Sequence, residues 1–315
     1  MTEIVPLPDI ARVKVDAALH GGALSIGNFD GIHVGHASLL ARTRAMAERF
    51  GGPAIACVFD PHPIAILRPE AEPKRLTTIE ERARRLGRIG IDYLVVCQTS
   101  RDLLDFTAEE FFQTLVIDNV RCRGMVEGEN FCFGKDRGGD VDLLRTACGR
   151  ESLEFEAMPM RAIAGEMISS TRIRECLLAG EVRAAKDMMA TPHRVTGTVI
   201  HGDARGRTIG FPTANLQAID VVIPAPGVYA AIATVDDKRF QAAVNVGRSP
   251  TFGAGHASQV EVHLLDFDGD LYGQALSVDF IDRVRDIAKF DSAAALANQL
   301  RQDIESTRNL LQPTR

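Results

Sequence analysis

A segment near the start of the chain combines glycines with two histidines, and it stands between an apolar run and an amphipathic stretch. Residues 27–36 have the sequence GNFDGIHVGH, so His33 and His36 are three positions apart. On the first turn of a helix this spacing points both side chains the same way. Glycines such as Gly31 let the backbone approach a ligand closely, and a helix N-terminus adds unpaired N–H groups and a partial positive charge. The segment therefore predicts a site for a polyphosphate.

Two alternative roles of this segment remain open. A His-x-x-His pair could bind a metal ion, although no third ligand is evident, and the segment could be a structural turn capped by histidines. The chain has neither a G-x-x-x-x-G-K-[ST] loop nor a G-x-G-x-x-G fingerprint. Nucleotide binding in this part of the chain is therefore expected to use the histidine turn.

A second candidate anion site lies at residues 168–174, which have the sequence ISSTRIR. Ser169 or Ser170 is expected to be the N-cap of a helix that ends at Gly180. Hydroxyl groups, unpaired N–H groups and Arg174, one turn into the helix, could together hold a phosphate. An ordinary capped helix explains the segment equally well when it is taken alone.

The longest glycine-rich stretch is residues 197–216, with the sequence GTVIHGDARGRTIGFPTANL. Glycines and arginines in a loop after a strand suit backbone that wraps around phosphates. Thr213 and Asn215 then present two oxygen ligands, and hard oxygen donors suit Mg²⁺. The alternative is a glycine-rich hairpin with a solvated pair of arginines. The residues expected to contact phosphate are Gly202, Arg205, Gly206 and Gly210.

Short apolar runs alternate with amphipathic stretches through the first part of the chain. Thr78 with Glu81, and Thr107 with Glu110, have the spacing of helix capping boxes. The alternation predicts a doubly wound α/β domain, a parallel sheet with helices on both faces. Ligands bind at the carboxyl ends of the strands in such sheets. The expected strands are 23–26, 54–59, 93–96, 122–126 and 153–158, and the expected helices are 36–50, 78–89, 107–117, 141–148 and 169–180.

The pattern changes near residue 188, after which the apolar runs are short and β-branched. Turn residues separate these runs, which predicts an antiparallel barrel or sandwich. A final helix is expected from an N-cap at Asp291 or Ser292 to about Leu311. The predicted domains are residues 1–187 and 188–315. The expected strands of the second domain are 195–200, 228–235, 240–246, 260–265 and 276–281.

The composition limits the classes of partner. The net charge is 36 − 42 = −6, whereas a nucleic-acid binder is usually basic, so no nucleic-acid partner is expected. No apolar run is long enough to cross a bilayer and the N-terminus lacks signal-peptide features, so the cytoplasm is the expected location. The six cysteines form no C-x-x-C pair and are expected to be buried free thiols.

Four arginines, at positions 82, 84, 85 and 88, lie on the helix expected at 78–89. They alternate with Glu80 and Glu81. This mixture of charges is typical of a solvated helix face, and a nucleic-acid patch is the weaker hypothesis. We therefore expect the arginines to be exposed.

The chain resembles the bacterial bifunctional riboflavin kinase/FMN adenylyltransferase family. The first domain resembles the histidine-motif nucleotidyltransferases through GNFDGIHVGH and ISSTRIR. Among these enzymes, it looks closest to the FAD synthetase domain of the bifunctional family. Residues 197–216 resemble the riboflavin kinase signature with its P-T-A-N segment. Further matching segments are DPHP at 60–63, EGENFCFG at 127–134, PGVYA at 226–230, NVGRSPTFG at 245–253, VEVHLLDF at 260–267 and DLYG at 270–273.

The resemblance implies two ATP-dependent reactions that use Mg²⁺. In the first domain, the FMN phosphate attacks the α-phosphorus of ATP and expels pyrophosphate, giving FAD. His33 and His36 would stabilise charge on the transferring phosphate, and Ser170, Thr171 and Arg174 would hold the leaving phosphates. Asn28 and Asn130 would help to position the nucleotide and the flavin. Such a reaction needs no nucleophile from the protein, because positioning and charge stabilisation carry the catalysis.

In the second domain, the resemblance implies phosphorylation of riboflavin to FMN. Glu261 matches the family's catalytic carboxylate, which would accept the proton of the attacking alcohol. The strand pattern alone favours a glutamate on the solvent face, since Glu261 alternates with Val260 and Val262. Arg285, followed by Phe290, resembles a segment that closes over flavin and nucleotide.

Two departures from the family pattern motivate alternatives. Cys132 stands where a more polar residue is expected, and Ile287 stands where glutamate is expected. One hypothesis is therefore a chain with one active and one degenerate domain. Another is a flavin- or RNA-binding regulator on the same scaffold. No obligate protein partner is evident beside the expected small molecules riboflavin, FMN, FAD and ATP.

Overall fold

The structure of the chain is a computed structural model that describes residues 1–159, 162–163, 166–202, 210–248 and 258–312. It contains two compact units, and each is described by itself. The first unit is Met1–Pro73 with Thr77–Ile168, and the second is Lys74–Leu76 with Ser169–Arg315. Residues 169–187 thus group with the second unit. The division of the two activities at residues 187 and 188 stays a prediction.

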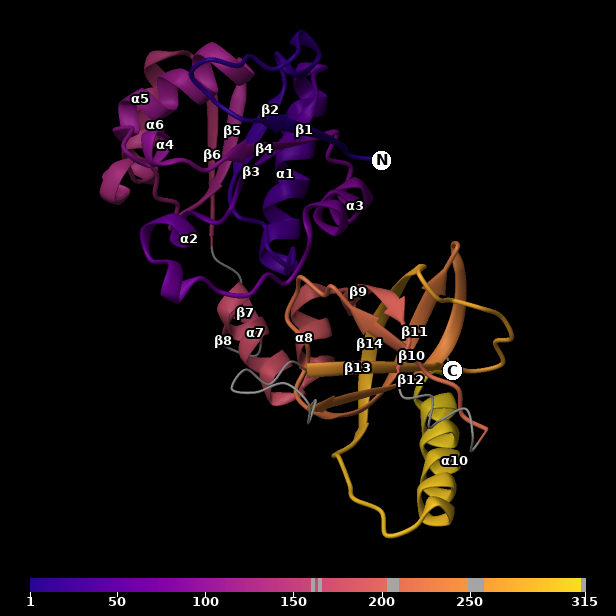
Figure 1. The fold of residues 1–315 in the computed structure, drawn as a ribbon. Coiled ribbons are helices and arrows are strands. Elements are labelled where there is room, and N and C mark those ends of the chain that lie inside the picture. Colours follow the sequence, from indigo (N-terminus) through magenta and orange to yellow (C-terminus); the bar gives the residue numbers. More distant parts are fainter. Residues whose placement is uncertain (160–161, 164–165, 203–209, 249–257, 313–315) are drawn as a thin grey trace. The chain divides into compact units, whose positions relative to one another are not determined.

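The first unit is built on a six-stranded sheet in which every pairing is parallel (Figure 1). Its strand order is β1-β4-β3-β2-β5-β6. Strands β3 and β4 therefore lie on one side of β2, and the later strands β5 and β6 lie on its other side. This confirms the predicted doubly wound sheet. The strands are β1 (Glu3–Leu7), β2 (Ala23–Ile26), β3 (Ala54–Asp60), β4 (Tyr93–Gln98), β5 (Gly124–Gly128) and β6 (Glu154–Met158).

Helices pack on both faces of this sheet, and each face has its own apolar core. Leu40 and Met46 of α1 and Leu86 of α3 belong to one core, and Leu115 and Leu144 belong to the other. The helices are α1 (Val34–Phe50), α2 (Pro63–Leu67), α3 (Ile79–Ile89), α4 (Arg101–Leu104), α5 (Ala108–Phe111) and α6 (Val141–Arg150), with short 3₁₀ turns at Ala17–Leu19, Pro69–Ala71 and Lys135–Arg137.

Local sequence accounts for the helix starts. Thr107 Oγ1 accepts from the Glu110 N–H and the Glu110 carboxylate accepts from the Thr107 N–H, so the predicted capping box is confirmed. Thr78 caps α3 by accepting from the Glu81 N–H. The helix after Thr107 does not stay α-helical to about residue 117. It continues as a π-helical segment, Phe112–Val120.

The second unit begins with α7 (Ser170–Ala179) and α8 (Val182–Met189) and continues as a closed barrel. The barrel has the strand order β10-β13-β12-β11-β14-β9, and all of its pairings are antiparallel. Of the two predicted architectures, the barrel is therefore the correct one. Its strands are β9 (His193–Ile200), β10 (Ala214–Gln217), β11 (Gly227–Val235), β12 (Lys238–Arg248), β13 (Ser258–Leu264) and β14 (Ala275–Arg285).

The last helix, α10 (Ala293–Leu310), begins after the N-cap Ser292, whose side chain accepts from the Ala295 N–H. It packs against β11, β12 and β14. A separate two-stranded sheet in the first unit consists of β7 (Ala162–Ile163) and β8 (Glu166–Met167). Within the part of the chain that the structure describes, no helix has the length and apolarity that a membrane crossing requires.

All six cysteines are free, and five of them are buried. The expectation of buried thiols is confirmed for five of the cysteines, whereas Cys132 is half-buried. Cys57 and Cys97 lie on the neighbouring strands β3 and β4, with their sulfur atoms 3.3 Å apart. The hydrogen bond with the neighbouring thiol and burial together hold the pKa of Cys57 well above its ordinary value.

Candidate active sites

The two histidines of the first motif lie together at the start of α1. His33 is the N-cap, and its Nδ1 accepts from the His36 N–H at 3.2 Å. The two imidazole rings stack, with their centroids 3.6 Å apart, and the rings of Phe29 and His36 form a T-shaped pair with centroids 5.3 Å apart. The prediction that both side chains point the same way is therefore confirmed. The pair gives the helix N-terminus two polar rings.

Both imidazoles are uncharged at neutral pH. Burial lowers the pKa of His33 to about 4, and it lowers that of His36 well below its ordinary value. The charges of His33 and Arg82 lower the pKa of His36 further. Nδ1 of His36 is buried and has no hydrogen-bond partner among the described residues. The pair therefore offers neutral N–H donors to a phosphate rather than two cations.

The backbone before α1 is strained at two side-chain-bearing residues. Phe29 and Ile32 both have φ of +44°, and Gly31 between them has φ of +83°. Only glycine adopts such angles without strain. Each non-glycine residue with such angles destabilises the folded state by about 1–3 kcal/mol. Phe29 and Ile32 are nevertheless buried in the apolar core. The turn is thus held in place by its surroundings.

Part of that support comes from α3, where the expectation of exposed arginines is wrong for Arg82 and Arg85, although Arg88 is exposed. Arg82 and Arg85 are only 5% and 3% exposed. Arg82 Nη2 donates to Asp30 Oδ1 at 3.3 Å, and Arg85 Nη1 donates to the Gly31 carbonyl at 3.0 Å. Positions 82, 85, 86 and 89 have the spacing of one helix face, so Arg82 and Arg85 share the inward face of Leu86. This periodicity was the signal in the sequence.

Thr77 completes the support of the turn. Its N–H and its hydroxyl both donate to Asp30 Oδ1, at 2.9 and 3.0 Å, and its Oγ1 accepts from the Gly31 N–H at 3.0 Å. Both backbone groups of Gly31 are therefore used within the fold. The structure gives Gly31 a turn-forming role, and its contact with ATP stays a prediction.

Asn28 and Asn130 occupy different surroundings in the first unit. Asn28 Nδ2 lies 2.8 Å from His62 Nε2, so the DPHP segment touches the histidine turn. Asn130 follows β5 and is exposed, and Cys132 Sγ contacts its carbonyl at 3.7 Å. Asn28 thus belongs to the group around α1. Asn130 is accessible, as its predicted contact with flavin requires.

A fully buried carboxyl group stands at the end of β5, one strand away from the histidine turn. Glu127 is 1% exposed, and its Oε1 accepts from the Ile26 N–H at 2.6 Å. Strand β2 pairs with β5 only at Ala23 and Leu24. The Glu127 side chain therefore provides an acceptor for the Ile26 N–H, which lies beyond the last paired residues of the two strands. Burial raises the pKa of Glu127 well above its ordinary value, and the bond from Ile26 acts against that rise. No sequence signal marked this group as a neutral acid.

Residues 169–174 of the second anion motif belong to the second unit. Ser169 is the N-cap of α7, which confirms one of the two predicted caps, and its Oγ accepts from the Arg172 N–H. Arg174 Nε donates to the Lys74 carbonyl at 2.7 Å. Ser170 and Thr171 form the first turn of α7. Their joint action with the histidines on one phosphate chain stays a prediction.

On the barrel, three polar side chains form a row across neighbouring strands. Asn215 and Glu261 were predicted site residues, and Asn245 was not. Glu261 on β13 is the register partner of Asn215 on β10 and of Asn245 on β12. Directly opposite residues of antiparallel strands point to the same face. Val260 and Val262 point into the barrel core, so the row lies on the outer wall. Asn245 Nδ2 donates to Glu261 Oε2 at 3.1 Å.

The glycine-rich loop meets this row at one described residue. A Cβ on Gly202 would lie 2.2 Å from Asn215 Nδ2, so only glycine leaves room for the Asn215 amide. Gly210 has φ of +85°, which other residues adopt at a cost. Thr213 directly precedes β10 and is half-buried. Arg205 and Gly206 lie outside the described residues, so their predicted phosphate contacts stay predictions.

Two neighbours of Glu261 on β13 also belong to this surface, and the sequence pattern did not identify them. His263 Nδ1 lies 2.7 Å from the Pro212 carbonyl, and its ring meets Phe211 edge-on. Gln259 bonds to Asn215 and Glu261. The period-2 spacing of residues 259, 261 and 263 was the available signal.

Arg285 is engaged by α10. Its Nε and Nη2 donate to the two carboxylate oxygens of Asp303 at 2.8 and 2.7 Å, and its Nη1 donates to the Asp286 carbonyl. The guanidinium also lies over Phe290, 5.7 Å from the ring centroid. Three of its five N–H groups are thus used within the chain. The predicted contact with flavin is left to the other two.

The described residues contain no group of three or more His, Cys, Asp or Glu side chains arranged to hold a metal ion. The His33–His36 pair therefore lacks a third ligand of these types within the described ranges.

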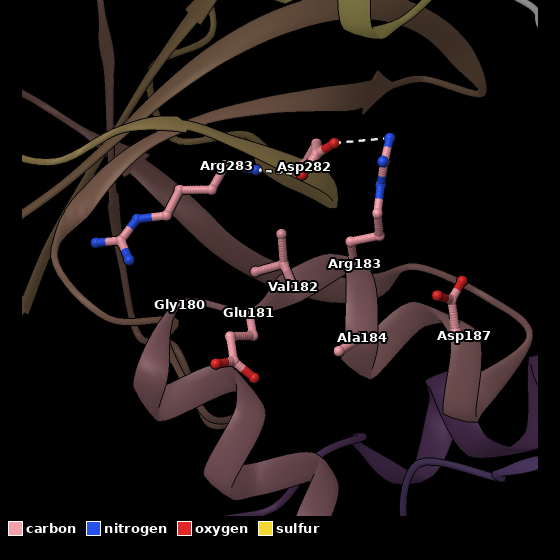
Figure 2. Close-up of a pocket in the computed structure, with 8 residues that line it drawn as sticks. All are labelled: Gly180, Glu181, Val182, Arg183, Ala184, Asp187, Asp282 and Arg283. Atoms are coloured by element: carbon pink, nitrogen blue, oxygen red, sulfur yellow. Dashed lines mark hydrogen bonds and ion pairs between the residues drawn. The ribbon is translucent and has the colours of Figure 1, made fainter. Parts of the chain in front are cut away.

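A pocket of about 460 Å³ opens in the second unit, beside the junction of α7 and α8. Figure 2 shows Arg183 and Asp282 on its rim, joined by an ion pair of 2.8 Å. Glu181 and Asp187 lie on the same rim. None of the residues predicted for either reaction lines it. The candidate sites are therefore the surfaces around His36 and Glu261 rather than this pocket.

Comparison with known families finds one match for each part of the chain. A family model described as FAD synthetase matches residues 15–172, and one described as Riboflavin kinase matches residues 189–311. The first match contains the histidine turn and the second contains the row around Glu261.

Individual relatives match along most of their length. A Pseudomonas fluorescens protein named bifunctional riboflavin kinase/FMN adenylyltransferase is 34% identical over 294 residues, which cover 93% of this chain and 94% of the relative. The Escherichia coli K12 protein of the same name is 34% identical over 288 residues, covering 91% and 92%. A crystal structure of a Streptococcus pneumoniae protein called a macrolide-efflux protein superimposes with a TM-score of 0.87 at 32% identity, covering 97% of this chain and 99% of the other.

Proposed function

The chain belongs to the family of bifunctional riboflavin kinases/FMN adenylyltransferases, and from this premise we propose which residues carry each reaction. The protein phosphorylates riboflavin to FMN with ATP, and it transfers an adenylyl group from ATP to FMN, giving FAD and pyrophosphate. The adenylyl transfer is assigned to the histidine turn of the first unit. The phosphorylation is assigned to the outer wall of the barrel.

In the adenylyl transfer, an oxygen of the FMN phosphate forms a bond to the α-phosphorus of ATP, and the bond to pyrophosphate breaks. The attacking group is already an anion, so the protein has to orient two phosphates and stabilise charge. His33 and His36 donate hydrogen bonds to the transferring phosphate from the N-terminus of α1. Ser170, Thr171 and Arg174 bind the pyrophosphate that leaves.

Asn28 and Asn130 complete this assignment. Asn28, held against His62, orients the nucleotide, and Asn130 contacts the flavin. Burial of the imidazoles supports the role of the histidines, because a neutral ring can donate from one nitrogen without the desolvation cost of a buried cation.

In the phosphorylation, Glu261 accepts the proton of the primary alcohol of riboflavin while the alcohol oxygen attacks the γ-phosphorus of ATP, and ADP leaves. A carboxylate within hydrogen-bond reach serves such a reaction. Gly202, Arg205, Gly206 and Gly210 hold the phosphates of ATP. Arg285 contributes to the flavin side with the N–H groups that Asp303 and Asp286 leave available.

Thr213 and Asn215 are proposed as the protein ligands of Mg²⁺ at this site. The donor set fits the ion, because Asn215 supplies a hard carbonyl oxygen beside the Glu261 carboxylate, and Mg²⁺ takes few protein oxygens while keeping waters and phosphate oxygens. When bound, the ion would neutralise charge on the β- and γ-phosphates. We propose the same ion requirement for the adenylyl transfer.

The observation that carries the kinase assignment is the register of β10, β13 and β12, which sets Asn215, Glu261 and Asn245 side by side. A solvated glutamate on a strand would not require a polar partner on each neighbouring strand. The site is therefore a built cluster on an otherwise ordinary barrel wall.

Two variants of the full chain test the assignment. Glu261→Gln is expected to lower the rate of FMN formation by about 10²–10⁴-fold, the usual contribution of a general base, and to leave FAD formation from added FMN unchanged. His36→Ala is expected to lower FAD formation by about 10²–10³-fold, as loss of a charge-stabilising donor does, while FMN accumulates. Chromatographic quantification of both products checks this. Loss of both activities in either folded variant would contradict two separate sites.

We also propose that the protein acts in the cytoplasm on small molecules, without a nucleic-acid or membrane partner. Six free thiols suit a reducing compartment, and the net charge of −6 disfavours binding to phosphate backbones. Retention on a heparin column at physiological salt would contradict the absence of a nucleic-acid partner.

A further inference from the structure

Gln259 lies between two side chains that the proposed phosphorylation uses. Its Nε2 atom donates to Asn215 Oδ1 at 2.9 Å and to Glu261 Oε1 at 3.1 Å. An amide nitrogen carries two hydrogens, so a single Nε2 makes both bonds at once. Gln259 is half-buried and stands two residues before Glu261 on β13, which places both side chains on the outer face.

These bonds determine how the Glu261 carboxylate is held. Gln259 donates to Oε1, and Asn245 Nδ2 donates to Oε2 at 3.1 Å. Each oxygen therefore has one amide donor on a neighbouring position, and rotation of the carboxylate breaks at least one bond. An ionised carboxylate has about four acceptor positions, so room remains for the hydroxyl of a substrate.

The same amide orients Asn215. A donor at Gln259 Nε2 requires an acceptor opposite it, which sets Oδ1 of Asn215 toward β13 and Nδ2 toward Gly202. The absent Cβ of Gly202 provides the space for that nitrogen, since it would lie 2.2 Å away. The direction in which Asn215 presents its oxygen therefore depends on Gln259 from one side and on Gly202 from the other.

We propose that Gln259 is a positioning residue of the kinase site, which holds the proposed base Glu261 and the proposed Mg²⁺ ligand Asn215 in one fixed arrangement. This inference rests on the function proposed above. Gln259 touches neither the alcohol nor the phosphates in this role. It acts through the two oxygens to which its amide donates.

Two variants of similar size separate the amide from the volume of the side chain. Gln259→Met keeps the length and removes both donors, and Gln259→Glu keeps the shape but turns the group into an acceptor that faces Glu261 and Asn215 Oδ1. Both are measured in the full chain with riboflavin, ATP and varied MgCl₂. Gln241→Met, at another half-buried glutamine on β12, is the matched control.

Gln259→Met is expected to lower kcat for FMN formation by about 10–100-fold, the size of effect that a misplacement of about 1 Å produces, and to raise the MgCl₂ concentration at half-saturation. The KM for riboflavin should stay unaltered, and so should the rate at which FAD forms from added FMN. Gln259→Glu should lose more, because two carboxylates then oppose each other. Gln241→Met should resemble the unaltered protein.

The outcomes that overturn the inference are distinct from those that overturn the proposed function. Unaltered kcat and MgCl₂ dependence in Gln259→Met, beside an inactive Glu261→Gln, would overturn the role of Gln259 alone. A parallel fall of both activities and of the melting temperature would mean a purely structural role. Full kinase activity in Glu261→Gln would overturn the proposed function. Because Gln259 acts partly through Glu261, the two changes remove a shared contribution, and the loss in the double variant should be smaller than the product of the two single losses.

Discussion

Arg82 Nη2 lies 3.3 Å from Asp30 Oδ1, and both side chains are almost completely buried, at 6% and 7% exposure. The pair joins α3 to the turn that precedes α1, although the two residues are 52 positions apart. Breaking a buried ion pair by removing one partner leaves the other charge without compensation. The position of the histidine pair therefore depends on a helix outside the motif.

The variant Arg82→Met tests this dependence. Loss of the guanidinium takes a charged partner from the buried Asp30 carboxylate, which still accepts from the N–H and hydroxyl of Thr77. The expected cost is about 3–5 kcal/mol in the free energy of unfolding. FAD formation is expected to fall by about 10²-fold through displacement of the turn. FMN formation should be unaffected, since it belongs to the other unit. Product quantification in the full chain measures both.

A matched change on the same helix is Arg88→Met, because Arg88 is exposed. It should alter neither activity. If Arg82→Met fails to fold, Arg82→Lys keeps the positive charge without the planar fork, and a selective loss of FAD formation should still appear. Equal rates of FAD formation in Arg82→Lys, Arg88→Met and the unaltered chain would show that the turn does not need Arg82.

The two histidines should not titrate in the neutral range. Burial lowers the pKa of His33 to about 4 and that of His36 well below its ordinary value. The folded state then binds fewer protons than the unfolded state below pH 6.5, so folding loses stability as the pH falls from about 6.5 to about 4. For His33 the shift corresponds to about 3 kcal/mol. The imidazole NMR signals of both residues should be constant from pH 8 to 5.5.

The replacement His33→Asn provides the control, since asparagine retains an oxygen that can cap α1. Acidification from pH 7 to 5 should destabilise this variant less than the unaltered chain in urea unfolding. Titration midpoints near 6.5 for both histidines would contradict burial as the dominant influence on their pKa values.

Glu127→Gln is expected to stabilise the first unit at neutral pH. Burial raises the pKa of Glu127 well above its ordinary value, so this group contributes stability in acid that is lost as the pH rises. Glutamine keeps an oxygen for the Ile26 N–H and never ionises. A gain of about 0.5–2 kcal/mol at pH 8, within the range of single stabilising changes, should disappear at pH 4.5. Exposed Glu129, two residues further, supplies the control Glu129→Gln, which should show neither effect in thermal melts.

Two ion pairs of α10, Asp303 with Arg285 and Arg308 with Asp266, allow a direct comparison of a buried and an exposed carboxylate. Asp303 is 3% exposed in its bidentate pair with Arg285, whereas Asp266 is 74% exposed in its pair with Arg308. Asp303→Asn should cost about 3–5 kcal/mol in the free energy of unfolding, whereas Asp266→Asn should leave the melting temperature almost unchanged, because solvent screens an exposed pair. Differential scanning calorimetry of the full chain measures both. Similar melting temperatures for the two variants would contradict the bidentate clamp.

The parts of the fold that sequence predicted are those with strong periodicity or local chemistry. Buried strands such as β3, and caps such as Thr107, are determined by residues close in the chain. Strand β1 was not predicted, because it is short and largely exposed at the edge of the sheet. Strand β10 was not predicted because its residues were interpreted only as ligands.

The candidate sites divide along the same line. His33, His36, Asn215 and Glu261 were identified from motifs, and the structure brings Asn215 and Glu261 into register. The residues that hold them were not identified. Arg82 and Arg85 were expected to be solvated because charged residues rarely lie inside. Their burial is explained by Asp30, which pairs with Arg82, and by Glu81 and the Gly31 carbonyl, which accept from Arg85. The role proposed for Gln259 depends on its hydrogen bond to Asn215, which is 44 positions away in the chain and lies on another strand.

The left-handed backbone at Phe29 and Ile32 has a practical consequence for protein engineering. Residues 27–36 would not keep their shape if they were grafted alone onto another sheet, because those two residues would relax to ordinary angles. A transplant would have to carry the Thr77–Arg85 stretch as well, because it contains the Thr77 hydroxyl and the guanidinium groups of Arg82 and Arg85 that hold the turn. The portable unit of this histidine turn is thus a pair of segments rather than a single sequence motif.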